Sequence, residues 1–463
     1  MKQTGVVLLV IVLCCTLGAF AQKLPGSGNA TATTKAAPPQ NWITPATSVA
    51  RAEDAGVRAH TNYVLAKGVD GMAARPETLG VTPNVSTVTH YETPSSMACV
   101  YKIPSNGNTS GCVPAHVAGS GGPQKGGWGA IAIVDAFDNP YAATELNTFT
   151  SFYGLPAADF TKVYANGNGS CTTPPVNAGW GLEISLDVQW AHVMAPKAKI
   201  ILVEACSNSY TDLMYAEYVA AQLVDAAGGG DITNSWGSGE FSGETGYDPY
   251  FGFYFPFNIS YFASAGDAGC GAQYPSSSPW VISAGGTTVN RLATNLHFKS
   301  ESCWAGSGGG TSAVETYQTT FAGGAYTGPW ANYQYGIFGQ GARSTPDIAF
   351  NADPNSGVVV YDCAYYSGTC YFLIVGGTSA SSPALAGIIN NANNRLGVGH
   401  INGTTGNGFY TAEENNMLYS QLGTQTAYSK NFYDVKAGTN GCSVDKDWDY
   451  CTGVGTPRGL LGK

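Results

Sequence analysis

The chain has 463 residues, of which 11% are charged and 44% hydrophobic, so it can bury a large core and is not a solvated polyelectrolyte. Its 61 glycines and 27 tyrosines are typical of a protein rich in strands and loops rather than of a helical bundle. The formal charge of −10 excludes a nucleic-acid partner, which would need a basic face.

The first 21 residues have the three parts of a secretory signal peptide. Lys2 supplies the positive charge, residues 6–17 are apolar, and residues 19–21 (Ala-Phe-Ala) form a small-x-small cleavage site. The apolar run is shorter than the ~20 residues that a membrane span needs, and no later segment reaches that length. We therefore predict cleavage before Gln22 and a secreted protein, extracellular or periplasmic, with no membrane partner afterwards.

The cysteines agree with an oxidising compartment. Cys14 and Cys15 leave with the signal peptide, so ten of the twelve cysteines remain, and an even number in an exported chain predicts disulfides rather than buried free thiols. The spacing matches no zinc site. Short loops favour Cys363–Cys370 and Cys442–Cys451 as pairs, followed by Cys99–Cys112.

Composition divides the rest of the chain. Residues 22–48 are rich in Ala, Thr, Pro and Gly and predict a flexible segment. Weak helical periodicity follows around residues 63–65, and a globular pattern begins at about Thr89. We predict a low-complexity lead-in or short prosegment over 22–88 and a single large domain over 89–463.

Buried strand-like runs alternate with helical patterns in the globular part. Such alternation predicts a mostly parallel sheet covered by helices on both faces, a three-layer α/β/α fold whose sites form at the carboxyl ends of the strands. In chain order the expected elements are a strand at 130–134, helices at 139–153 and 182–194, a strand at 199–203, a helix at 212–227, strands at 231–235, 259–263 and 280–284, and a helix at 384–394.

A run of small residues, 376–383 (Gly-Gly-Thr-Ser-Ala-Ser-Ser-Pro), joins the strand-like residues 372–375 to the last of these helices. Ser379 stands where the helix begins, and Pro383 suits its first turn. Unpaired N–H groups at a helix N-terminus favour a developing oxyanion beside a nucleophilic hydroxyl. An ordinary loop that caps a helix explains the same residues, so the choice depends on finding a base.

The candidate base is a carboxylate. None of the six histidines has the context of a catalytic base, and His192, in an apolar helical stretch, is expected to be a packed or surface residue. Glu183 and Asp187 are four residues apart on a predicted helix, so both carboxylates project from one face. Because their neighbours are apolar, a shared proton and shifted acidity explain the pair better than a solvated polar face does.

Further features follow in chain order. Residues 264–269 read Ser-Ala-Gly-Asp-Ala-Gly, and residues 433–435, 447–449 and 452–457 form an Asp- and Gly-rich C-terminal region. With the Glu183 and Asp187 pair and residues 377–383, these motifs resemble the sedolisin family of serine-carboxyl peptidases over about residues 125–457. The resemblance implies a subtilisin-like fold in which Ser, Glu and Asp replace Ser, His and Asp.

Carried over to this chain, the resemblance implies that Ser379 is the nucleophile and Glu183 its general base, oriented by Asp187. Asp267, when protonated, would donate to the oxyanion, although such an Asp can also be a simple turn residue. A carboxylate base and a protonated donor both favour acid. The expected function is a secreted, acid-acting endopeptidase for proteins or peptides. Asp135, which has no partner histidine, is expected to be structural.

The resemblance also implies one structural calcium ion at the C-terminus, where hard oxygen ligands gather. Asp434 and Asp449 would supply side-chain oxygens and Val435 a backbone carbonyl. The family has glycines where this chain has Asp445 and Asp447, so these two residues either add charge to the site or distort it. A turn cluster held by a disulfide is the alternative.

Only about 70 residues separate Gln22 from the globular start, whereas the family has a long folded propeptide, so autoprocessing is not expected. We expect a monomer. Two other functions stay open, a catalytically weak or inactive sedolisin-like binding protein and a subtilisin-like peptidase with a histidine base. The intact set of Ser379, Glu183, Asp187 and Asp267 argues against the first, and no suitable histidine motif supports the second.

Overall fold

The computed structural model describes residues 42–68, 72–76, 90–107, 110–252, 259–317, 320–321, 324–325, 329–338, 341–395, 410–422 and 424–463. The expected signal peptide and the first part of the lead-in lie outside the described residues. Everything described belongs to one compact unit that begins at Asn41.

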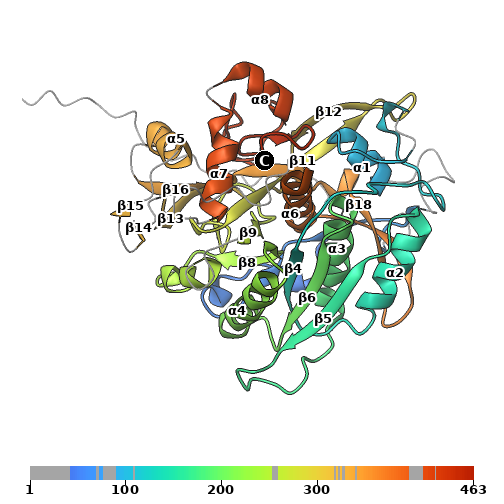
Figure 1. The fold of residues 1–463 in the computed structure, drawn as a ribbon, viewed down its shortest axis with the longest axis horizontal. Helices are drawn as coiled ribbons and strands as arrows, with labels where there is room; N and C mark the ends of the chain where they lie inside the picture. The colour runs from blue at the N-terminus through green and yellow to red at the C-terminus, as the bar shows by residue number, and fades with distance from the viewer. Residues whose placement is uncertain are drawn as a thin grey trace, which may run out of the picture. The chain divides into compact units, whose positions relative to one another are not determined.

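In the described part of the chain, eight strands form the central sheet (Figure 1). Along the sheet the order is β12-β11-β9-β7-β4-β6-β5, with β17 also paired to β11. All neighbours are parallel except β11 and β12. The strands are β4 (Ala130–Ala136), β5 (Asp159–Ala165), β6 (Lys199–Ala205), β7 (Gly230–Asn234), β9 (Ile259–Ser264), β11 (Ile282–Arg291), β12 (Phe298–Cys303) and β17 (Ile348–Asn351).

Alternate side chains of β4 face opposite layers, as the period of a strand requires. Ile131 and Ile133 join the hydrophobic cluster that contains α3 (Ala178–Met194) and α6 (Thr378–Arg395). Val134 joins the cluster on the other face with α4 (Tyr210–Ala226). Both layers are fully buried, and each large aliphatic side chain contributes roughly 1.5–3 kcal/mol. The predicted subtilisin-like α/β/α fold is confirmed.

Smaller elements surround this core. The further helices are α1 (Pro94–Val100), α2 (Ala142–Tyr153), α5 (Pro329–Phe338), α7 (Tyr410–Ser420) and α8 (Gln425–Asn431). The further strands are β1 (Trp42–Ile43), β2 (His60–Thr61), β3 (Val64–Ala66), β8 (Trp236–Gly239), β10 (Gln273–Tyr274), β13 (Gly310–Thr316), β14 (Thr320–Phe321), β15 (Gly324–Ala325), β16 (Ala342–Thr345), β18 (Val358–Asp362), β19 (Tyr371–Gly376), β20 (Phe432–Tyr433) and β21 (Thr456–Pro457).

The lead-in differs most from expectation. Residues 64–66, near the weak helical pattern, form strand β3 instead, because β3 pairs with β19 in a four-stranded sheet of order β1-β3-β19-β18. Its three side chains are buried. β2 pairs with β8 in another small sheet. The compact unit therefore starts well before the predicted boundary at residue 89.

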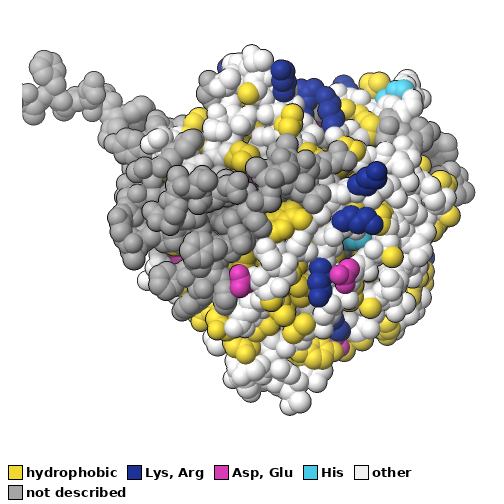
Figure 2. Space-filling model, in the orientation of Figure 1, with side chains coloured by type: hydrophobic (Ala, Val, Ile, Leu, Met, Phe, Trp, Pro, Cys, Tyr) yellow, Lys and Arg dark blue, Asp and Glu magenta, His cyan; other side chains and the backbone are white. Residues whose placement is uncertain are grey.

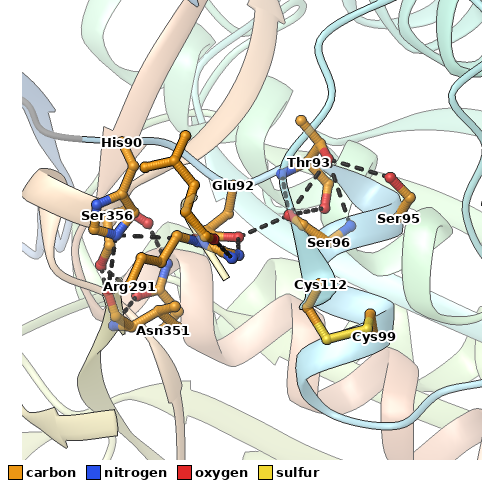
Figure 3. Close-up of polar contacts among 12 residues, drawn as sticks. His90, Glu92, Thr93, Ser95, Ser96, Cys99, Cys112, Arg291, Asn351 and Ser356 are labelled. Atoms are coloured by element: carbon orange, nitrogen blue, oxygen red, sulfur yellow. Dashed lines mark hydrogen bonds and ion pairs between the residues drawn. A yellow bond between two sulfur atoms is a disulfide. The ribbon is translucent and has the colours of Figure 1, made fainter. Parts of the chain in front are cut away.

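The start of α1 is tied to the end of β11 by buried polar contacts (Figure 3). Thr93 and Ser96 form a capping box at the helix N-terminus, and Ser96 also donates to Glu92 at 2.7 Å. Glu92 receives two hydrogen bonds from the Arg291 guanidinium, at 2.7 and 2.5 Å, and the two side chains are 0% and 1% exposed.

Breaking this ion pair should destabilise the fold, because one charge would stay buried without its partner. We expect Arg291→Ala to lower the free energy of unfolding by roughly 3–5 kcal/mol. The matched control is Arg58→Ala, which breaks an exposed i,i+4 pair with Asp54 and should cost at most about 1 kcal/mol. Thermal unfolding of both variants beside the wild type measures the difference, and equal melting temperatures would contradict it.

Five disulfides link the ten cysteines that follow the predicted signal peptide. The predicted pairs Cys99–Cys112 and Cys363–Cys370 are present. The predicted Cys442–Cys451 pair is wrong. These residues pair with Cys270 and Cys303 instead, so two bridges tie the C-terminal loop to the loop after β9 and to β12. The fifth bridge is Cys171–Cys206.

Uncharged atoms cover most of the described surface on the face in Figure 2, as the low charged fraction requires. None of the described helices is both long and apolar enough to cross a lipid bilayer.

Candidate active site

The candidate nucleophile lies in the first turn of α6. Gly377 precedes the helix with φ +105°, a left-handed conformation that L-residues with a side chain rarely adopt. The helix starts at Thr378, earlier than predicted, and Pro383 lies inside it. Pro383 has no N–H for the carbonyl of Ser379, four residues before it. That carbonyl accepts the Ser235 hydroxyl at 3.3 Å instead.

The candidate base meets the nucleophile between two packed helices. α3 begins at the N-cap Asn177, whose side chain accepts the N–H groups of Gly179 and Trp180, and α3 packs against α6. Ser379 Oγ donates to Glu183 Oε2 at 3.0 Å and lies 3.2 Å from the carbonyl oxygen of Ser235. Both side chains are fully buried. The structure thus joins the two residues that the sequence places on separate helices.

Three buried carboxyl groups form one cluster behind Ser379. Burial raises the pKa of Glu183 well above its ordinary value, and the charges of Asp187 and Asp135 raise it further. Burial likewise raises the pKa of Asp187, with partial compensation from Ser235 and Glu183, and the pKa of Asp135, where the charge of Asp187 adds to it. Three such groups cannot all be ionised at once. The cluster therefore stays partly protonated at pH values well above those at which carboxylic acids usually titrate.

Ser235 was not named by the sequence analysis, and Asp135, which was expected to be structural, lies close enough to raise the pKa of Glu183. Asp135 is the second-last residue of the buried strand β4, and among the described residues neither of its carboxyl oxygens has a hydrogen-bond partner. It belongs to the electrostatics of the candidate base and is not a remote structural residue. Its position at the carboxyl end of a central strand was the available signal.

Asp267 is hydrogen-bonded to Thr378, the residue before Ser379. Its Oδ1 accepts the N–H and the hydroxyl of Thr378, both at 2.8 Å. Burial raises its pKa to about 7, and the two bonds from Thr378 oppose that rise. Its Oδ2 is buried with no partner in the described part of the chain and lies against Gly377. Asp267 is therefore neutral in acid and has one oxygen free to donate.

His192 is a packed residue. Its Nε2 lies 2.9 Å from the carbonyl oxygen of Pro156, it is fully buried, and burial lowers its pKa to about 4. A neutral imidazole already bonded to a backbone carbonyl suits a structural role.

The C-terminal loop brings part of the predicted calcium set together. Asp434 accepts the N–H of Asp447 at 3.1 Å and pairs with Lys436 at 2.8 Å. Burial raises the pKa of Tyr428, and the charges of Asp434, Asp447 and Asp449 add to that rise, so negative charge gathers here. Asp447 has φ +74°, a conformation natural for the glycine that the family has at this position.

The other predicted ligands fit less well. Asp449 accepts the N–H groups of Cys451 and Thr452, each at 2.8 Å, and so holds its own turn. Val435 is buried, whereas Asp445 is exposed. Among the described residues no group of three or more His, Cys, Asp or Glu side chains could hold a metal ion. The oxygen donors and local charge of Asp434 and Asp447 fit calcium chemistry, and the site stays a prediction.

Two known peptidases are similar to this chain in sequence. No family model matches the chain. It is 28% identical to kumamolisin of Bacillus sp. (strain MN-32) over 362 residues, 71% of this chain and 58% of kumamolisin. It is 28% identical to sedolisin of Pseudomonas sp. (strain 101) over 199 residues, 40% of this chain and 28% of sedolisin. The matched regions thus span less than two thirds of both relatives.

Among solved structures, Pseudomonas sedolisin, a serine-carboxyl proteinase complexed with two molecules of pseudo-iodotyrostatin, has the same fold. Its TM-score is 0.59 at 22% identity, covering 80% of this chain and 96% of the sedolisin chain. The ordered motifs and the two relatives support membership of the sedolisin family, and the solved sedolisin structure shows that the fold is shared.

Proposed function

We propose that this protein is a serine-carboxyl endopeptidase that hydrolyses protein or peptide substrates at acid pH. The observation that carries the proposal is the 3.0 Å hydrogen bond from Ser379 Oγ to Glu183, a carboxylate in a buried cluster with a raised pKa. A hydroxyl bonded to a buried carboxylate is the arrangement that general-base catalysis requires.

In the proposed mechanism, Glu183 takes the proton of Ser379 as Oγ attacks the substrate carbonyl. The Ser379 N–H and protonated Asp267 stabilise the oxyanion. Glu183 then gives the proton to the leaving amine, the C–N bond breaks and an acyl-enzyme remains on Ser379. Water, activated by Glu183, releases the acid product. Asp187 and Asp135 hold the remaining protons of the cluster and so set the acidity of Glu183.

The acid optimum follows from two requirements with opposite signs. The carboxyl cluster must lose a proton for Glu183 to act as a base, whereas Asp267, whose pKa is about 7, must keep its own. Activity should therefore rise as the cluster loses its first proton and fall as the pH rises past about 7. Peptidase assays on an unfolded protein substrate across the pH range test this, and an optimum near pH 8 would reject the mechanism.

We propose secretion for the same chain, supported by its five disulfides and by the signal-like first 21 residues. Mass spectrometry of the protein recovered outside cells measures where the signal peptide is removed, and we expect a chain that begins at Gln22.

We also propose that calcium binds the C-terminal loop, with the carboxylates of Asp434 and Asp447 as the main ligands. A bound ion would offset the repulsion among these carboxylates and stabilise only the folded form. Calcium should raise the melting temperature at about pH 6, and a chelator should reverse the change.

Asp434→Asn should abolish the calcium response of the melting temperature. It is a better test than Asp449→Ala, because losing Asp449 would also remove the hydrogen bonds that hold its own turn. A response that survives in Asp434→Asn, or a wild type that does not respond to calcium, would refute this site.

A further inference from the structure

Four carboxyl side chains gather between β13 and the loop that follows β8. These residues, the β13 acids, are Glu240 after β8, Glu244 and Asp248 on two short 3₁₀ helices (Glu244–Gly246 and Asp248–Phe251), and Glu315 on β13. Three of them are buried, since Glu244 is 0% exposed, Glu315 3% and Asp248 8%. β8 directly follows Ser235, whose carbonyl oxygen lies 3.2 Å from Ser379 Oγ. The loop therefore continues from the strand beside the candidate nucleophile.

Hydrogen bonds join the loop to β13. Glu240 accepts the hydroxyl of Ser312 and also the N–H of Ala313, the latter at 2.9 Å. The carboxyl groups of Asp248 and Glu315 bond to each other. Two carboxyl groups share a hydrogen bond only while one of them holds a proton, because an ionised carboxylate only accepts. Part of the contact between the loop and β13 therefore depends on protonation.

The buried members of the β13 acids hold their protons beyond the usual range. Burial raises the pKa of Glu315 to about 9, of Glu244 to about 8 and of Asp248 to about 6. The charges of Asp248 and Glu244 raise the pKa of Glu315 further. Hydrogen bonds from Ser278 and Tyr274 oppose the rise at Asp248. The Oε1 atoms of Glu244 and Glu315 are buried with no hydrogen-bond partner in the described part of the chain, so ionising either group leaves a poorly solvated charge.

The groups around the β13 acids do not supply a compensating charge. Tyr210 of α4, Tyr247 between the two 3₁₀ helices and Tyr274 of β10 face them. Burial raises the pKa of Tyr210 and Tyr274, so both phenols stay neutral. Within the described ranges, no Lys, Arg or His is among the groups whose charge acts on the three buried acids. Ionisation therefore makes the loop and β13 repel each other.

We propose that the β13 acids form a latch that holds the loop after β8 against β13 in acid and releases the loop as the pH rises past neutral. The latched protein keeps protons that the released chain has lost, so closure becomes less favourable as the pH rises. The stabilisation is complete below about pH 4, the ordinary range of Asp and Glu, and is lost by about pH 9, where Glu315 also ionises. Release would loosen β8 beside the nucleophile, a consequence that rests on the proposed function.

Hydrogen exchange in the Ser379→Ala chain tests the latch without peptidase activity. After correction for the intrinsic effect of pH, the amides of residues 240–251 should exchange at least about tenfold faster at pH 8 than at pH 5. Glu315→Gln in the same chain should keep the loop protected at pH 8, because its amide donates to Asp248 at any pH. Asp248→Asn changes the other partner of this bond and should protect the loop in the same way.

The matched control is Glu217→Gln. Glu217 of α4 is fully buried and burial raises its pKa to about 8, but it is not one of the β13 acids, so its replacement should leave exchange of the loop unchanged. Equal exchange of the loop at pH 5 and pH 8 would overturn the latch. So would release that persists in both Glu315→Gln and Asp248→Asn, or protection by Glu217→Gln as well.

Activity measurements separate the latch from the proposed function. Wild type held at pH 8 and returned to acid should lose activity several-fold faster than Glu315→Gln, whereas simple deprotonation of Asp267 would be reversed at once. Equal losses in the two enzymes would overturn the link from the latch to activity. A wild type with no peptidase activity in acid would reject the proposed function, and the exchange of the loop would still decide the latch.

Discussion

Replacing Ser379 by alanine is expected to lower kcat by a factor on the order of 10⁶, and replacing Glu183 by glutamine should cost nearly as much. The two groups act as one unit, since the hydroxyl is a weak nucleophile until Glu183 accepts its proton. The double variant should therefore be no slower than either single variant. Single-turnover assays on a peptide substrate at the acid optimum measure all three.

The control for this pair is Glu145→Gln, since Glu145 is also a buried carboxyl with a raised pKa but bonds Ser185 and Asn139 instead of the nucleophile. It should keep kcat while changing stability. Additive losses in the Ser379 and Glu183 double variant, or a Glu183→Gln enzyme with normal kcat, would mean that Glu183 is not the base.

Which features could be predicted depends on how local their signals are. The strand at 130–134 and the helix at 182–194 are apolar and are bounded by polar or proline residues. Their secondary structure can therefore be predicted from the local pattern without knowledge of the fold. Ser379 and Glu183 lie on such elements, and their family motifs mark them. A parallel sheet brings residues that are distant in the sequence together at the carboxyl ends of its strands, which is where the sequence analysis expected the site.

The rest depends on pairing between distant parts of the chain. β1 and β2 have two residues each and β3 has three, too few for a period, and β3 forms only because β19, about 300 residues later, offers its edge. The disulfide error has the same origin. A short loop favours Cys442–Cys451 by chain entropy, but the fold places each of them beside another strand or loop.

The role of Asp135 was lost for a related reason. Its sequence context, the end of an apolar strand, indicates burial but not its neighbours. Only the packing of α3 on β4 places it near Asp187, where the interaction of two acids becomes visible. The spacing of residues along the chain was enough to find Glu183 and Asp187. It could not show the role of Asp135, which depends on a neighbour that is distant in the sequence.

Substitutions of Asp267 are expected to have the second large effect on activity. Alanine and asparagine at this position test different properties of the side chain. Asp267→Ala removes a donor to the oxyanion and should lower kcat by about 10²–10³-fold. Asp267→Asn keeps the shape and an amide that donates at any pH. If deprotonation of Asp267 causes the loss of activity above its pKa of about 7, the Asn variant should lose that alkaline limb and work at higher pH than the wild type.

The sign of this shift follows from the charge. Above about pH 7 the wild-type Asp267 is an anion that repels the oxyanion, whereas the amide stays neutral, so the two enzymes should differ most in the alkaline range. Below pH 7 both donate, and their rates should converge apart from the altered bonds to Thr378. Profiles of kcat against pH for wild type, Asp267→Asn and Asp267→Ala measure this, and an unchanged alkaline limb in Asp267→Asn would assign the fall in activity to another group.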